Sequence, residues 1–185
     1  IALCANLMKK EGTLTNNLVV RTVMSNIGLS VAFDQLGIDS IMTKVGDRYV
    51  LEEMQARGAS IGGEDSGHII YLREHTTGDG ILTALQVVAA MKKEGRPLSE
   101  LAKIMTVFPQ SLINVDTKSR PDIQTIPEIV AVIRKVETSL GHRGRVLVRY
   151  SGTQNMCRVM VEGPTQEDTD RYCREIADVV KAAIG

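Results

Sequence analysis

Segments rich in β-branched residues alternate with amphipathic segments along residues 1–109, and this alternation restricts the possible folds more than any other feature of the sequence. The β-branched segments predict strands at residues 17–25, 40–45, 59–64 and 68–75. The amphipathic segments predict helices at residues 2–10, 28–36, 49–57 and 81–95. Strands that alternate with helices are typical of an α/β layer, so this is the fold class that we expect for the first part of the chain.

The longest helix is expected at residues 81–95, because apolar side chains recur there near the helical period. The recurring residues are Ile81, Leu85, Val88 and Ala89. We expect the carboxylate of Asp79 to lie at the start of this helix, where the helix dipole favours negative charge. A further helix is expected over residues 98–108, with Ser99 as its N-cap.

The segment KVGDRYV, residues 44–50, lies where a predicted strand gives way to a predicted helix. We expect Asp47 to cap the start of that helix and Gly58 to end it. Arg48 stands at the same junction, and from there its guanidinium could reach a ligand.

The pattern changes after Pro109 to the order β-α-β-β-α. The strands are expected at residues 111–118, 145–150 and 157–163, and the first helix at 127–140. On the terminal helix, one face is expected to consist of Tyr172, Ile176, Val179 and Ala183. This order suits a compact α+β domain, so we expect two domains, residues 1–109 and 110–185.

Composition excludes several function classes. The chain has 22 Lys and Arg against 22 Asp and Glu, so no net charge draws it to nucleic acid or to an anionic membrane. No apolar run reaches the length of a membrane span. Three widely spaced cysteines indicate neither a disulfide framework nor a zinc knuckle, which favours a reducing compartment such as the cytoplasm. The first twelve residues, which lack an initiator Met, are expected to be a helix from within a longer chain.

The loop RYSGTQN, residues 149–155, lies between two predicted strands. Arg149 and Ser151 are two residues apart and would share a face of an extended strand. Gly152 lets the backbone approach a ligand closely, and Thr153 adds a second hydroxyl. With Arg158 as a further cation, these groups suit a phosphate dianion. The alternative is a hairpin turn that uses residues common in turns.

The hexapeptide GEDSGH, residues 63–68, concentrates polar groups between two apolar runs. A carboxylate beside a hydroxyl and an imidazole can bind the hydroxyls of a sugar. Glu64 and His68 could instead bind a metal, although no third ligand stands at a suitable spacing. A simple turn is the third alternative.

Several of these motifs occur in the order found in one known family. GGEDSGHII, TTGDGILTALQ and RVLVRYSGTQNMCRVMVEG, together with VVRTVMSNIGL and TKVGDRYVLEEM, make the chain similar to the C-terminal half of the α-D-phosphohexomutases. Within that family it most resembles the bacterial branch that acts on glucosamine phosphates. The resemblance implies a mixed-sheet α/β domain, the family's third, followed by a small α+β domain, its fourth.

The resemblance also implies roles for individual residues. Glu64, Ser66 and His68 would contact the sugar, with Arg48 as a further candidate on the sugar side. The phosphate-binding residues would be Arg149, Ser151, Gly152, Thr153 and Arg158.

Three departures from the family pattern are evident. Asp65 stands where Gln or Met is usual, and Gln154-Asn155 replaces a usual Glu-Pro. The chain also has neither the phosphoserine loop nor the Mg²⁺-binding loop of the family's first two domains. We therefore expect no catalytic residue and no metal site in this chain, and no activity from it alone.

The implied reaction of the whole enzyme interconverts glucosamine 6-phosphate and glucosamine 1-phosphate through phosphoserine and a bisphosphate intermediate, with Mg²⁺ as cofactor. The expected partners are a hexose phosphate and the two missing N-terminal domains, with a second copy in a homodimer as a further candidate. Two alternatives stay open: a fragment of a phosphomannomutase/phosphoglucomutase, and a phosphosugar-binding module without turnover.

Overall fold

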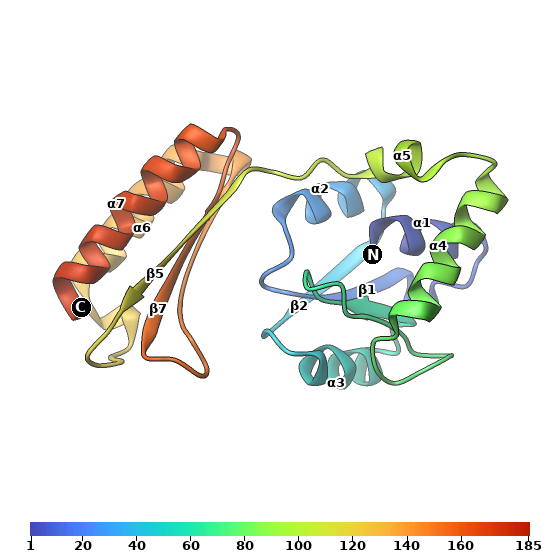
Figure 1. Ribbon diagram of the computed structural model, residues 1–185, viewed down its shortest axis with the longest axis horizontal. Helices are drawn as coiled ribbons and strands as arrows, with labels where there is room; N and C mark the ends of the chain where they lie inside the picture. Colours follow the sequence, from blue (N-terminus) through green and yellow to red (C-terminus); the bar gives the residue numbers. More distant parts are fainter. The chain divides into compact units, whose positions relative to one another are not determined.

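The computed structural model describes residues 1–185, which form two compact units, Ile1–Val107 and Phe108–Gly185. Each unit has its own sheet and its own helices (Figure 1). The mixed α/β and α+β fold classes expected from the sequence are confirmed. None of the helices combines the length and the apolar character that crossing a lipid bilayer requires.

The first unit is built on a four-stranded mixed sheet with the order β2-β1-β3-β4. Strand β1 (Leu18–Thr22) pairs in parallel with β2 (Asp39–Thr43) and with β3 (Ile61–Gly63). Strand β4 (Ile69–Tyr71) runs antiparallel to β3. Every residue of β1 is buried, because this strand has a neighbour on each side and helices over both faces.

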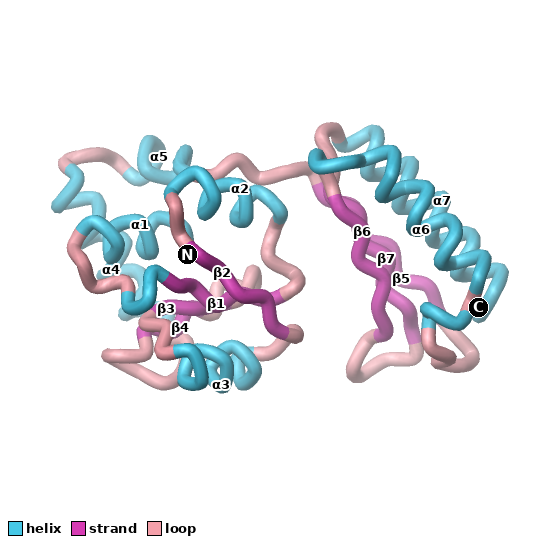
Figure 2. The backbone as a smooth tube through the Cα atoms, turned by 180° about the vertical axis from the view of Figure 1, so that it is seen from behind, coloured by secondary structure: helices cyan, strands magenta, loops and turns pink.

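Helices cover both faces of this sheet, as an α/β sheet with parallel strands requires. Figure 2 shows α1 (Ala2–Lys10) and α2 (Ile27–Leu36) on one side and α3 (Asp47–Arg57) on the other. One apolar core lies under α1 and α2, around Phe33 and Val19, and a second lies under α3, around Met54 and Val20.

Helix α4 (Gly80–Glu94) follows the sheet, and its start confirms the expectation for Asp79. The Asp79 side chain accepts hydrogen bonds from the backbone N–H groups of Ile81 and Leu82, at 2.8 and 3.0 Å. Gly58 likewise ends α3 in the left-handed conformation, with a φ of 67°.

Three expectations about helix ends are wrong. Gly46, not Asp47, is the N-cap of α3, so Asp47 is the first residue inside that helix. The helix expected over residues 98–108 is only one turn long, because α5 (Leu98–Leu101) passes into a 3-10 turn at Ala102–Ile104. Pro97 is its N-cap, so Ser99 lies inside the helix and caps nothing.

The second unit has a three-stranded antiparallel sheet with the order β5-β7-β6. Its strands are β5 (Gln110–Asp116), β6 (Arg145–Tyr150) and β7 (Met156–Glu162). Helices α6 (Pro127–Leu140) and α7 (Gln166–Ile184) lie together on one face of this sheet (Figure 1). Alternate strand residues point into the core under these helices, among them Cys157, Val159 and Val161.

The buried stripe of α7 differs from the expected one. Ile176 is buried as expected and Tyr172 and Val179 are partly buried, whereas Ala183 is exposed. The side chains that face the core are instead Cys173, Ile176, Ala177, Val180 and Ile184. The two stripes share a helical period and differ by a rotation of about one residue, which apolar spacing alone does not resolve.

Candidate functional site

The loop between β6 and β7 folds tightly on itself. The N–H of Ser151 donates to the carbonyl of Met156 at 2.9 Å, which closes the hairpin. The buried hydroxyl oxygen of Ser151 accepts from the backbone N–H groups of Thr153 and Gln154, at 3.4 and 3.2 Å. A Cβ on Gly152 would meet no atom within 4 Å, so the space beside this residue is open to a ligand.

Arg149 and Arg158 lie directly opposite each other on β6 and β7. The Nε atoms of both guanidinium groups are buried and have no hydrogen-bond partner. Burial, and then the charge of Arg158, lower the pKa of Arg149 from its ordinary value. Two like charges opposite each other destabilise a sheet, and an anion placed between them would relieve that cost.

Hydrogen bonds of two side chains, Arg120 and Tyr150, join this hairpin to the segment that follows β5. Arg120 donates through Nη2 to the carbonyl of Gln154 at 2.6 Å and to the Asn155 Oδ1 at 3.1 Å. The Tyr150 hydroxyl donates to the carbonyl of Pro121 at 2.8 Å. Sequence reasoning missed Arg120, since nothing in the polar stretch KSRPD indicates which distant residues it contacts.

Asn114 also belongs beside the arginine pair. It is the β5 residue opposite Arg158, so Asn114, Arg158 and Arg149 form one row across the three strands. This row lies on the sheet face opposite the helices, because the neighbouring residues of alternate parity point into the core. An amide next to two guanidinium groups adds a further hydrogen-bond donor for an anion.

The loop 63–68 is a turn that joins β3 to β4. The N–H of Glu64 donates to the carbonyl of His68 at 2.9 Å, and the N–H of Gly67 donates to the carbonyl of Glu64 at 3.1 Å. Gly67 has a φ of 90°, which a residue with a side chain rarely adopts. Backbone bonds within the loop therefore fix its conformation.

The side chains of this loop contact two other segments of the first unit. Glu64 accepts through Oε1 from the N–H of Gly46 at 2.8 Å. The His68 Nε2 lies 3.7 Å from the Asp47 Oδ2. The His68 ring lies against Gly78, where a Cβ would come within 2.0 Å of the ring Cδ2. These contacts could not be predicted from the sequence, where only the glycine–acid pairs in KVGD and TTGDG mark the two segments.

The other residues expected on the sugar side are less constrained. Ser66 and Asp65 are exposed. Arg48 donates through Nε to the Glu52 Oε1 at 2.7 Å, an exposed pair along α3. That hydrogen bond raises the pKa of Arg48, and no contact in the structure joins this side chain to the loop.

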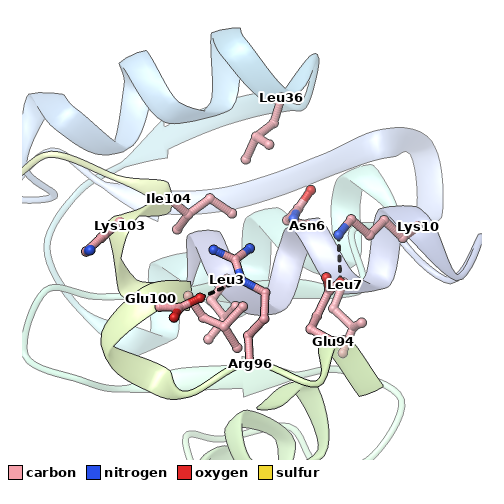
Figure 3. A pocket seen from close by; sticks show the side chains of 11 residues that line it. Leu3, Asn6, Leu7, Lys10, Leu36, Glu94, Arg96, Glu100, Lys103 and Ile104 are labelled. Atoms are coloured by element: carbon pink, nitrogen blue, oxygen red, sulfur yellow. Dashed lines mark hydrogen bonds and ion pairs between the residues drawn. The ribbon is translucent and has the colours of Figure 1, made fainter. Parts of the chain in front are cut away.

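A cavity of about 240 Å³ opens beside the loop, lined on one side by Glu64, Asp65 and Gly67 and on another by Ser25 and Asn26 at the start of α2. A second cavity, of about 250 Å³, lies between α1, α4 and α5 (Figure 3). Its charged groups form the pairs Lys10–Glu94 and Arg96–Glu100, at 2.6 and 3.1 Å. No residue expected to bind substrate lines this second cavity, and we assign it no role.

Family models match both units. Residues 1–108 match "Phosphoglucomutase/phosphomannomutase, alpha/beta/alpha domain III", and residues 112–179 match the C-terminal domain of the same family. The chain belongs to the phosphoglucomutase/phosphomannomutase family. The resemblance seen in the sequence motifs is thereby confirmed.

Curated relatives match the whole chain. It is 78% identical over 185 residues to a phosphoglucosamine mutase of Syntrophus aciditrophicus, and 62% identical to one of Syntrophobacter fumaroxidans. All of this chain is covered in both matches, but only 41% of each relative. The chain thus spans less than half the length of these curated relatives.

Solved structures of this family share the fold. An N-acetylphosphoglucosamine mutase of Aspergillus fumigatus superposes with a TM-score of 0.83 at 19% identity, over 98% of this chain and 42% of that one. Another structure of the Aspergillus fumigatus enzyme, in complex with GlcNAc-6P and magnesium, gives a TM-score of 0.79 at 19% identity over 97% of this chain and 46% of that one. At such low identity these matches establish the fold alone.

No set of side chains in this chain fits the magnesium ion that the resemblance implies. No three His, Cys, Asp or Glu residues lie close enough together to hold a metal ion. The two alternative metal ligands have other contacts: Glu64 accepts from Gly46, and His68 lies beside Asp47 and Gly78.

Proposed function

We propose that this chain is the substrate-recognising part of a mutase that interconverts glucosamine 6-phosphate and glucosamine 1-phosphate. The observation that carries the proposal is the Arg149–Arg158 pair, whose buried Nε atoms lack partners beside a loop that is open at Gly152. Two like charges held opposite each other on partly buried side chains are costly, and a bound anion would offset that cost. The names of the two curated relatives quoted above support glucosamine phosphate as the substrate.

In this proposal the second unit binds the phosphate that is not reacting. Arg149 and Arg158 neutralise its charge, while the hydroxyls of Ser151 and Thr153 and the open backbone at Gly152 complete the contacts. The hydroxyl oxygen of Ser151 already accepts two loop N–H groups, so its proton is available for donation to the phosphate. Charge neutralisation and positioning are the main demands of phosphoryl transfer.

The first unit would bind the sugar. Glu64 would accept hydrogen bonds from sugar hydroxyls through the carboxylate oxygen that Gly46 does not occupy. His68 and Ser66 lie on the same turn and would complete this side, with Arg48 as the outermost candidate. The phosphoserine and the Mg²⁺ belong, in this proposal, to the part of the enzyme that precedes this chain, and a bisphosphate sugar would be the intermediate. We place the enzyme in the cytoplasm, and a homodimer is a further possible assembly.

Titration calorimetry with glucosamine 6-phosphate tests the phosphate site. Arg149→Ala should weaken binding roughly 10- to 100-fold, because it removes a charge-assisted contact. Arg143→Ala, which removes an exposed cation of the same unit, is the matched control and should leave the affinity unchanged. Equal affinities for the two variants would favour the hairpin-turn interpretation.

Turnover separates the enzyme from the two alternatives. The chain alone should not form glucosamine 1-phosphate in a coupled assay, whereas the chain together with the preceding part of the Syntrophus aciditrophicus relative should. A preference for mannose or glucose phosphates would indicate the phosphomannomutase/phosphoglucomutase alternative. Binding without turnover in the reconstituted pair would indicate a binding module.

A further inference from the structure

The segment that follows β5, residues 117–122, lies beside the loop of residues 149–155, which we call the phosphate loop. The end of β5 pairs with the start of β7, so the segment and the loop leave the sheet at the same end (Figure 1). At the start of the loop, the Tyr150 hydroxyl donates to a carbonyl of the segment at 2.8 Å. At the end of the loop, the carbonyl of Asn155 accepts from the N–H of Thr117 at 3.0 Å. The segment is therefore joined to both ends of the phosphate loop.

Arg120 is the charged side chain of this segment that contacts the phosphate loop. It donates through Nη2 to the carbonyl of Gln154 at 2.6 Å and to the Asn155 Oδ1 at 3.1 Å. The same carbonyl accepts from the N–H of Met156 at 2.9 Å, and the N–H of Gln154 donates to the hydroxyl oxygen of Ser151 at 3.2 Å. Hydrogen bonds on both sides of the Gln154 Cα thus restrict this residue. Among them, the bond from Arg120 comes from outside the hairpin.

The phosphate loop has few other restraints beyond Ser151. Residues 152–155 are exposed, and Gly152 has the conformational freedom of a residue without a side chain. A proline, usual at position 155 in the family pattern, would fix φ there and would also restrict the residue before it. Asn155 imposes no such restriction. In this chain the two residues that a proline would restrict are the two that Arg120 holds by hydrogen bonds.

We propose that Arg120 is a positioning residue of the phosphate site, which holds the phosphate loop in the conformation that binds the phosphate. The inference rests on the proposed function, in which Arg149, Arg158 and the hydroxyl of Ser151 contact the phosphate. Arg120 acts through Gln154 and does not touch the phosphate itself. Because the N–H of Gln154 donates to the Ser151 oxygen, fixing Gln154 also fixes the direction in which the Ser151 hydroxyl can donate. A loop ordered before the ligand arrives loses less conformational entropy on binding.

The exposure of Arg120 separates this role from a contribution to global stability. Interactions of exposed charged side chains add little to the free energy of unfolding. Removing the guanidinium should therefore leave the urea midpoint of the second unit nearly unchanged. The loop itself should become more mobile, and its affinity for phosphate should fall.

Backbone ¹⁵N relaxation of the chain without ligand tests whether Arg120 orders the loop. In Arg120→Ala the order parameters of residues 152–155 should fall from the rigid value of about 0.85 to below about 0.6. Lys118→Ala is the matched control, because it removes an exposed cation of the same segment and leaves the hydrogen bonds to the loop in place. The order parameters of the loop should not change in this control.

Titration calorimetry with inorganic phosphate and with glucosamine 6-phosphate tests the effect on binding. Arg120→Ala should weaken the binding of both ligands roughly 3- to 10-fold, as expected for the loss of one or two exposed hydrogen bonds. Asn155→Ala should have a smaller effect, because the bond to the Gln154 carbonyl remains. The double variant should bind as weakly as Arg120→Ala and no more weakly, since the two residues act through one contact. Lys118→Ala should bind normally.

The two measurements together decide the role of Arg120. A more mobile loop with weaker binding supports the positioning role. Weaker binding with an unchanged loop would make Arg120 a direct ligand of the phosphate and overturn the inference. A more mobile loop with normal binding would reduce Arg120 to a structural contact and overturn it equally.

Arg149→Ala separates this inference from the proposed function. Normal binding of both ligands by Arg149→Ala would contradict the phosphate site itself. Weak binding by Arg149→Ala, with normal binding and a normal loop in Arg120→Ala, would overturn the positioning role alone and leave the proposed function standing.

Discussion

The two candidate loops differ in whether their polar side chains have partners within the protein. In the first unit the side chains of Glu64 and His68 already contact their own protein, Glu64 at Gly46 and His68 at Asp47 and Gly78. In the second unit Arg149 and Arg158 lie opposite each other as partly buried side chains, and their buried Nε atoms contact no acceptor. Internal contacts therefore hold two side chains of the first loop, whereas the arginine pair sets two like charges opposite each other.

In the proposed function, this difference would give the two loops different tasks. A loop held by internal bonds can read the positions of sugar hydroxyls, because its groups stay in place before the substrate arrives. A pair of repelling cations gains more from an anion than isolated cations would, because the anion also removes their repulsion. We therefore expect the second unit to supply affinity and the first to supply selectivity.

Ligand addition should give the largest contrast between the units. Glucosamine 6-phosphate at about 100 times its dissociation constant should stabilise a binding unit by about 2.7 kcal/mol. We expect amide hydrogen exchange to slow most in β6 and β7 and much less in β3 and β4. Greater protection of β3 and β4 would reverse the comparison.

Gly78→Ala should damage the first unit alone. The new Cβ would lie 2.0 Å from the His68 Cδ2, so the imidazole must leave its place. We expect a loss of only about 1 kcal/mol in the free energy of unfolding of the first unit, because the displaced imidazole is a surface side chain that can turn into solvent. The His68 proton resonances should shift in NMR spectra. Gly80→Ala is the control, because its Cβ would meet nothing within 4 Å, and it should be neutral or slightly stabilising.

Glu64→Gln tests whether the loop 63–68 depends on the hydrogen bond between Glu64 and Gly46. The amide keeps the shape of the side chain but weakens the charge-assisted bond from the N–H of Gly46. Unfolding in urea should show a loss of about 1 kcal/mol for the first unit. Asp65→Asn is the control, because it changes the neighbouring exposed carboxylate. An equal loss in free energy of unfolding for that variant would show that the hydrogen bond to Gly46 does not stabilise the loop.

Arg158→Ala should change stability and binding in opposite directions, and its effect on stability should be the smallest of those predicted here. Removing one of two opposed cations should stabilise the ligand-free second unit by about 0.5 kcal/mol. The same change should weaken binding of glucosamine 6-phosphate in calorimetry. A variant that is destabilised and binds normally would show that the pair is a structural feature only.

Local patterns in the sequence were sufficient for most of the fold. Asp79 and Gly58 were placed correctly because a cap depends on a few consecutive residues. The helix expected over residues 98–108 failed because its apolar residues fit a short helix followed by a 3-10 turn just as well. The buried side of α7 depends on β5 and β7, which pack against it, and Ala183 was therefore misplaced.

The candidate site shows the same limit. Two short motifs, each of consecutive residues, were enough to select the loops around Glu64 and around Ser151 as candidates. The residues that hold these loops, including Gly78 and Arg120, come from distant segments and were not predicted. These residues act through tertiary contacts, and the spacing of residues within one segment does not predict such contacts.

The sheet of the second unit also carries an uneven distribution of charge along its length. Four residues before Arg149 on β6, Arg145 donates to the buried carboxylate of Glu162 at 2.6 Å, so the charges at that end cancel. At the other end Arg149 and Arg158 add. The two ends are about 13 Å apart for a strand of this kind, which is longer than the screening distance at physiological salt. An approaching dianion is thus drawn along β6 and β7 toward one end, and its rate of capture should fall as salt is added.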